Sequence, residues 1–182
     1  MKKYEITNES INFRGVKLFR IRALQDFRDV KAGDLGGYIE KEDNLSQYDY
    51  CWVYDNAKVF GDAWIYGDAE VYGNAMVYDY ARVSGNAYVH GDIWLYNSTD
   101  INGNADVYKD THVLQIGAIG SRDDTTTFFR TKDKKIYVRC GCFEGDIEKF
   151  EKAVEKKHKD TKHEKAYKLA IELAKLQIEL ED

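Results

Sequence analysis

Aliphatic residues recur at every sixth position through the middle of the chain. The stretch "VFGDAWIYGDAEVYGNAM" at positions 59–76 shows the unit: an aliphatic residue, an aromatic residue, Gly, Asp or Asn, Ala, and one variable residue. A period of six does not match the 3.6 residues of a helical turn, and a glycine in most units would destabilise a helix. The pattern instead predicts short strands, each followed by a corner where Gly, Asn and Asp adopt positive φ at low cost. The aliphatic positions are Val53, Val59, Ile65, Val71, Val77, Val83, Val89, Leu95, Ile101, Val107, Val113 and Ile119.

Three such hexads are expected to close one 18-residue turn of a triangular coil. Short strands with equal corners predict a parallel β-helix whose coils stack about 4.8 Å apart, with the valines inside and the alanines at crowded corners. The repeat begins near residue 47 and ends at 119, which corresponds to about four coils. These hexads resemble the hexapeptide-repeat family, whose fold is the left-handed parallel β-helix. The handedness is what the resemblance implies, because periodicity alone does not show it.

The residue after each aliphatic position is predicted to face outward, above its counterpart 18 positions later. The column with the strongest functional interest consists of Tyr54, Tyr72, His90 and Tyr108. Such a row either only stiffens one face of the coil or presents an aromatic surface to a partner, another subunit or a flat ligand. The sequence leaves both interpretations open.

The two ends of a β-helix must be covered. Residues 1–46 are predicted to form an N-terminal β cap, with two alternating segments around Arg14-Gly15. Residues 120–182 are predicted to form a β-hairpin that turns at 132–134, followed by a helix capped by Asp146 and a second helix. The second helix carries an apolar stripe that either packs on the hairpin or meets a partner helix in an oligomer. The stripe consists of Leu169, Leu173, Leu176 and Leu180, widened by Ile171 and Ile178. The expected fold is therefore mainly β in three parts: 1–46, 47–119 and 120–182.

Composition narrows the function classes. The chain has no proline, which fits a backbone used almost throughout in regular pairing. A net charge of −5 argues against general nucleic-acid or anionic-membrane binding. No apolar run approaches the ~18 residues of a membrane span, and the first ten residues do not look like a signal peptide. The three cysteines form no disulfide framework or zinc pattern, because Cys140-Gly-Cys142 lacks further ligands at suitable spacing. We therefore expect a reduced, cytoplasmic protein without a metal.

One segment has the composition of an anion site. "IGSRDDTTTFFR" supplies hydroxyl and guanidinium groups within ten positions, and these groups bind phosphate or carboxylate. The alternative is that Arg122 pairs with Asp123 and Asp124 within a turn. The candidate ligand-binding residues are Ser121, Arg122, Thr125, Thr126, Thr127 and Arg130.

A narrower resemblance spans nearly the whole chain. "RIRALQDFRDVKAGDLGGYIEKEDNLSQ", the hexads, "IGAIGSRDDTTTFFRTKD" and "CGCFEGDIEKFEKAV" resemble a family common in bacteriophage and bacterial genomes and often labelled as transferases. The resemblance suggests a non-enzymatic, homotrimeric phage protein acting in the host cytoplasm. Such an anti-defence protein would sequester a nucleotide-like host signal or block a host protein at subunit junctions, and it would need no cofactor.

Two other functions remain open. Hexapeptide-repeat acyltransferases, as the resemblance has it, use a histidine as general base between subunits, together with acetyl-CoA. His90 and His112 are the candidates for that role, although the unbroken register leaves no extruded loop to build a substrate pocket. The third possibility is a structural spacer whose number of coils is free to vary.

Overall fold

The computed structural model describes residues 2–181 and contains two compact units, 1–104 and 105–182. No described helix is long and apolar enough to cross a membrane.

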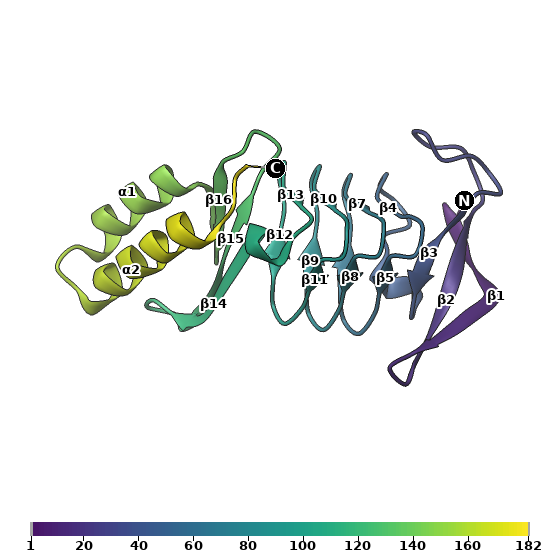
Figure 1. Cartoon of the computed structure of the whole chain (residues 1–182), viewed down its shortest axis with the longest axis horizontal. Coiled ribbons are helices and arrows are strands. Elements are labelled where there is room, and N and C mark those ends of the chain that lie inside the picture. Colours follow the sequence, from purple (N-terminus) through teal and green to yellow (C-terminus); the bar gives the residue numbers. More distant parts are fainter. Residues whose placement is uncertain (1, 182) are drawn as a thin grey trace. The chain divides into compact units, whose positions relative to one another are not determined.

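The first unit begins with an antiparallel β cap, as the sequence predicts. Strands β1 (Tyr4–Phe13) and β2 (Val16–Ala23) turn at Arg14 and Gly15, whose φ angles are 51° and 87°. Strand β3 (Leu35–Ile39) pairs antiparallel with β2 and parallel with β5 (Lys58–Val59), so the cap sheet continues into one face of the coil. Figure 1 shows this transition at the purple end of the chain. A short 3-10 helix, η1 (Glu42–Asn44), leads into the first coil.

The coils follow as two-residue strands in three parallel columns. Each strand pairs with the strand 18 residues away, so Val53 lies beside Val71 and Val59 beside Val77. The inward aliphatic residues from Val53 to Val107 are at most 2% exposed, which confirms the interior predicted from the hexads. The coil of about four turns is the hexapeptide-repeat, left-handed β-helix type of fold (Figure 1). The remaining strands are β4 (Trp52–Val53), β6 (Trp64–Ile65), β7 (Glu70–Val71), β8 (Met76–Val77), β9 (Arg82–Val83), β10 (Tyr88–Val89), β11 (Trp94–Leu95), β12 (Asp100–Ile101) and, in the second unit, β13 (Asp106–Val107).

The corners explain the Gly, Asp and Asn positions of the repeat. Gly85 has φ 66°, and a Cβ on it would lie 2.7 Å from the backbone nitrogen of Gly103 in the next coil. Asp79 adopts φ 58° at a corner that lacks glycine, and its Oδ2 accepts the Asn97 N–H at 3.2 Å. Corner residues therefore provide both the positive φ and part of the bonding between coils.

The second unit contains an antiparallel sheet covered by two helices. The sheet order is β14-β15-β16-β17, and the hairpin predicted around 132–134 connects β15 to β16. Its core includes Phe128, Val138, Phe150 and Ile171. The bounds are η2 (Asp110–His112), β14 (Val113–Ile119), β15 (Asp124–Arg130), β16 (Ile136–Cys140), β17 (Phe143–Asp146), α1 (Ile147–His158) and α2 (Lys162–Gln177). Asp146 occupies the N-cap position of α1, as predicted, but its side chain makes no capping hydrogen bond.

The last two aliphatic positions of the repeat are corrected by the structure. Val113 and Ile119 were expected inside the coil, but they lie in β14, where Val113 pairs antiparallel with Phe129. In the hexad that begins at Val113, the two corner positions are occupied by Gln115 and Ile116 in place of Gly and Asp or Asn. Without a residue that favours positive φ, the chain continues as one extended strand.

The apolar stripe of α2 is also corrected in part. The helix packs with Tyr167, Ala170, Ile171 and Ala174 inward, and Ile178 just beyond its end is also buried. The predicted leucines face outward instead: Leu169, Leu173 and Leu176 are 67%, 45% and 86% exposed. The buried face of α2 thus consists of Ala and Ile side chains together with Tyr167, and the leucine face is left outward.

Candidate functional site

A cavity of about 240 Å³ lies within the second unit. Segment 121–122, the β16–β17 turn, and both helices contribute side chains to it. The lining residues are Ser121, Arg122, Cys140, Cys142, Phe143, Phe150, Ala153, Val154, Lys157, His158 and Tyr167.

One part of the cavity lining is built around a two-residue turn. Cys140 pairs with Phe143, so Gly141 and Cys142 form the turn, and Gly141 has φ 57°. A Cβ on Gly141 would collide with the guanidinium of Arg122. Glycine therefore allows Arg122 to lie against the turn, where its Nη2 is 3.9 Å from Cys142 Sγ. This contact with the arginine lowers the pKa of the exposed Cys142 thiol.

Cys140 and Tyr167, which line the cavity, belong to a buried polar cluster. Thr126 Oγ1 donates to Cys140 Sγ at 3.1 Å, and the Tyr167 hydroxyl lies 3.5 Å from the same sulfur. Burial and this contact raise the pKa of Tyr167, which therefore stays protonated at neutral pH. Gly120 leaves room for the tyrosine, because a Cβ there would overlap the hydroxyl.

The charge of the cavity is positive, and one wall is aromatic. Arg122 and Lys157 are exposed cations, and Ser121 adds a hydroxyl. Burial and the Lys157 charge lower the pKa of His158, so its imidazole is neutral at pH 7 and has one donor and one acceptor. The rings of Phe143 and Phe150 lie 5.0 Å apart on the apolar side. This arrangement suits a small anion that carries a flat or apolar group.

The candidate anion-binding residues do not form one cluster. Ser121 and Arg122 line the cavity, whereas Thr126 and Thr127 are buried in β15 and Thr125 is half-buried. Arg130 is 2% exposed and is occupied by internal contacts. Successive side chains of a strand point to opposite faces, and in β15 the side chains on both faces are buried from residue 126 to residue 130. These side chains are therefore not accessible to a ligand.

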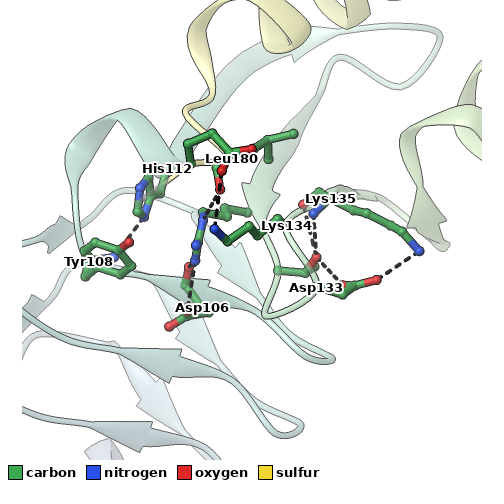
Figure 2. A network of polar contacts seen from close by, with 10 residues as sticks. Asp106, Tyr108, His112, Asp133, Lys134, Lys135 and Leu180 are labelled. Atoms are coloured by element: carbon green, nitrogen blue, oxygen red, sulfur yellow. Dashed lines mark hydrogen bonds and ion pairs between the residues drawn. The ribbon is translucent and has the colours of Figure 1, made fainter.

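Arg130 belongs to a second polar network, whose members Asp106, Tyr108, His112 and Leu180 are labelled in Figure 2. Its Nη1 donates to Asp106 Oδ2 at 2.7 Å, its Nε donates to the Leu180 carbonyl at 3.2 Å, and its guanidinium lies 5.3 Å from the centre of the Tyr108 ring. Tyr108 is thus held within the second unit by Arg130 and by the His112 ring, 4.3 Å away. This network links β13, β15 and the C-terminal segment.

His112 is fully buried in the same network. Its Nδ1 accepts the Tyr108 N–H at 3.3 Å, and its Nε2 has no hydrogen-bond partner within residues 2–181 (Figure 2). Burial, together with the charges of Arg130 and Lys109, lowers the pKa of His112 to about 4. The imidazole is therefore neutral at physiological pH and does not face solvent.

The outward column of the first unit forms in part as an aromatic stack. Tyr72 and His90 stack at 4.5 Å, and the Tyr54 hydroxyl donates to Asp29 at 3.1 Å. A hollow of about 220 Å³ beside Tyr54 and Tyr72 is also lined by carboxylates, from Asp29, Asp55 and Glu70. Negative charge at this place favours a cation over an anion. The column with Phe60, Tyr78 and Tyr96 is likewise stacked, with ring centres 5.0 and 5.6 Å apart.

Sequence reasoning missed the cavity because its members are far apart in the chain. From the sequence, Cys140 and Cys142 were considered only as an incomplete zinc pattern. The available signal was the glycine between two cysteines, since a turn there exposes the second thiol. Among the described residues, no group of three or more His, Cys, Asp or Glu side chains is arranged for a metal ion.

Comparison with known proteins gives a partial match. No protein-family model matches the chain. A protein of Escherichia coli (strain K12) named uncharacterized acetyltransferase YdcK is 39% identical over 62 residues. The match covers 30% of this chain and only 19% of that protein's length. The chain is therefore similar to this protein over a limited stretch, and its β-helix fold is established by the stacked strands of the structure.

Proposed function

We propose that this chain is a non-enzymatic binding protein whose cavity in the second unit holds a small anionic, nucleotide-like ligand. The observation that carries the proposal is the presence of two cations, Arg122 and Lys157, beside an aromatic wall in one cavity of about 240 Å³. Arginine binds phosphate or carboxylate with two parallel N–H donors, and Phe143 offers a surface for an apolar group.

The size of the cavity limits the ligand. Drug-sized molecules usually occupy about 300–1,000 Å³. The cavity, at about 240 Å³, accommodates one ring or one phosphate group with its attachment. A mononucleotide or ADP-ribose would place one end inside and leave the other outside.

The resemblance to phage proteins extends this proposal to a biological role. A phage protein of this type would act in the host cytoplasm and sequester a nucleotide-like host signal, or block a host protein, as a counter-defence. In a homotrimer, neighbouring subunits would contribute further residues to a ligand end that protrudes from the cavity. No cofactor is needed for this role.

A thermal-shift screen followed by calorimetry tests the proposal. Mononucleotides, ADP-ribose and cyclic dinucleotides would be compared on wild type, Arg122→Ala and Lys157→Ala, with Arg82→Ala on β9 as the exposed-arginine control. A ligand at 100 times its Kd stabilises a protein by about 2.7 kcal/mol, which is measurable. We expect stabilisation of the wild type and the control, and its loss in both cavity variants. The proposal fails if no anionic ligand stabilises the protein or if Arg122→Ala binds equally well.

Acetyl transfer is the second candidate, favoured by the name of the E. coli relative. Of the two candidate histidines, His112 is fully buried, so the half-buried His90 is the one that an acceptor could reach. The test is turnover of acetyl-CoA with amine and hydroxyl acceptors by wild type and His90→Ala. Absence of turnover and of binding at millimolar acetyl-CoA would remove this candidate.

A further inference from the structure

We propose that Cys142 is a covalent modification site that forms a mixed disulfide with small anionic disulfides. Its thiol is exposed at the cavity, within 3.9 Å of the Arg122 guanidinium. The proposal uses the same cavity as the proposed function but requires no nucleotide-like ligand.

The first argument is the contrast between two thiols on one turn. Cys140 is 8% exposed and is enclosed by the Thr126 and Tyr167 hydroxyls. Cys142, two residues later, is exposed and has an arginine as its polar neighbour. A thiolate is the attacking species in disulfide exchange, and a nearby cation increases its population. The geometry therefore selects Cys142 over Cys140.

The second argument is the charge around the thiol. Lys157 also lines the cavity, and within the described chain no carboxylate pairs with it. The charge of the Asp124 carboxylate acts on Arg122, but Asp124 does not line the cavity. Two cations beside one thiol attract a disulfide that carries carboxylates and disfavour a cationic one.

The third argument is space. The cavity of about 240 Å³ extends from Cys142 to Phe143 and Phe150, so a thiol-linked group of several atoms can be seated after the reaction. The position of Arg122 depends on Gly141, because a side chain at that residue would displace the guanidinium. The glycine of the turn thus leaves the space in which the cation lies beside the thiol.

The reaction is a simple exchange. The Cys142 thiolate attacks one sulfur of R–S–S–R, the S–S bond breaks, and a new bond forms between Sγ and that sulfur. The other half leaves as RS⁻ and takes a proton from water. The disulfide is the oxidant, so no further electron acceptor is needed.

The test compares disulfides of different charge on the reduced protein without nucleotide. Oxidised glutathione is anionic, bis(2-hydroxyethyl) disulfide is neutral and cystamine is cationic. Rates are measured by acid quenching, intact mass and peptide mapping, each normalised to the rate of the uncharged thiol 2-mercaptoethanol with the same disulfide. We expect Cys142 to react roughly tenfold faster with oxidised glutathione than with cystamine.

Substitutions test the effect of the Arg122 charge separately from the accessibility of each thiol. Arg122→Ala is expected to remove most of the preference for the anionic disulfide, while Arg82→Ala retains it. Cys142→Ser should abolish the mass shift, and Cys140→Ser should keep it. The wild-type protein alone can overturn the proposal. It does so if all three disulfides react at equal normalised rates, or if the modification is found at Cys140 or Cys51. Because nucleotide is absent, failure here is distinct from failure of nucleotide binding.

Discussion

The guanidinium of Arg122 lies 3.9 Å from the Cys142 sulfur, against the turn that joins β16 to β17. This relationship places a cation, a thiol and an aromatic wall in one cavity, although the residues come from separate elements. It also makes the cavity sensitive to the single residue between the two cysteines.

Gly141→Ala is expected to disrupt that relationship. Gly141 has φ 57°, and an added Cβ would collide with Arg122. Displacing the guanidinium removes the group that lowers the pKa of the Cys142 thiol, so the pKa should rise and the thiolate fraction at pH 7 should fall. The measurement is the pH dependence of iodoacetamide alkylation at Cys142. An unchanged alkylation profile would show that Arg122 does not act on the thiol.

Val77→Ala is expected to destabilise the coil by about 2 kcal/mol, because it removes two methyl-sized groups and leaves a cavity. Val77 is fully buried between Val59 and Leu95 of the adjacent coils. Urea unfolding measures the change, and the exposed Arg82→Ala on β9 is the control with a cost within about 0.5 kcal/mol. Equal stability of both variants would mean that the aliphatic column does not hold the coil together.

These two sites show what the sequence could predict. Val77 and its counterparts are separated by a fixed spacing, and each unit carries its own corner residues, so local information defines the coil. The end of the coil was predicted too late because Val113 and Ile119 keep the period while the corner residues have already disappeared. Corners, more than aliphatic spacing, determine whether the chain turns.

The candidate site was less predictable because it depends on tertiary packing. Arg122 follows β14, Cys142 belongs to a hairpin turn, and Lys157 lies near the end of α1. No spacing in the sequence relates them. The face of α2 that packs was also ambiguous, because Leu173 and Ala174 are adjacent and only Ala174 belongs to the buried core.

His112 is expected to make stability depend on pH. Its folded pKa of about 4 lies below the unfolded value near 6.5, so the folded state binds fewer protons in this range. The contribution is fully present above pH 6.5 and is lost as the pH falls toward 4, by about 3 kcal/mol at most. Denaturant unfolding at pH 7 and pH 4 would compare wild type with His112→Gln. The wild type should lose more stability between the two pH values, and equal losses would contradict the assignment.

The outward leucines of α2 are expected to matter for assembly and not for folding. Leu169, Leu173 and Leu176 are exposed, so replacing all three with Gln should change stability by less than about 1 kcal/mol. If the proposed homo-oligomer uses this face, the triple variant should be monomeric in native mass spectrometry, whereas Glu172→Gln on the same helix should assemble as wild type. An unchanged subunit number in the triple variant would place the contact elsewhere.

Deleting one complete coil separates the proposed site from the alternatives. Removal of residues 71–88 joins Glu70 to Val89 and preserves the register, because Glu70 pairs with Tyr88 and Val71 with Val89 in the stacked coils. All residues of the cavity lie between Ser121 and Tyr167, outside the deletion. We therefore expect the shortened chain to fold and to keep both nucleotide binding and the Cys142 reaction, as measured by calorimetry and intact mass. Loss of binding in a folded deletion variant would instead assign the ligand to the column of Tyr54, Tyr72 and His90, since the deletion removes Tyr72. Absence of binding in both proteins would leave the spacer as the remaining interpretation of the coil.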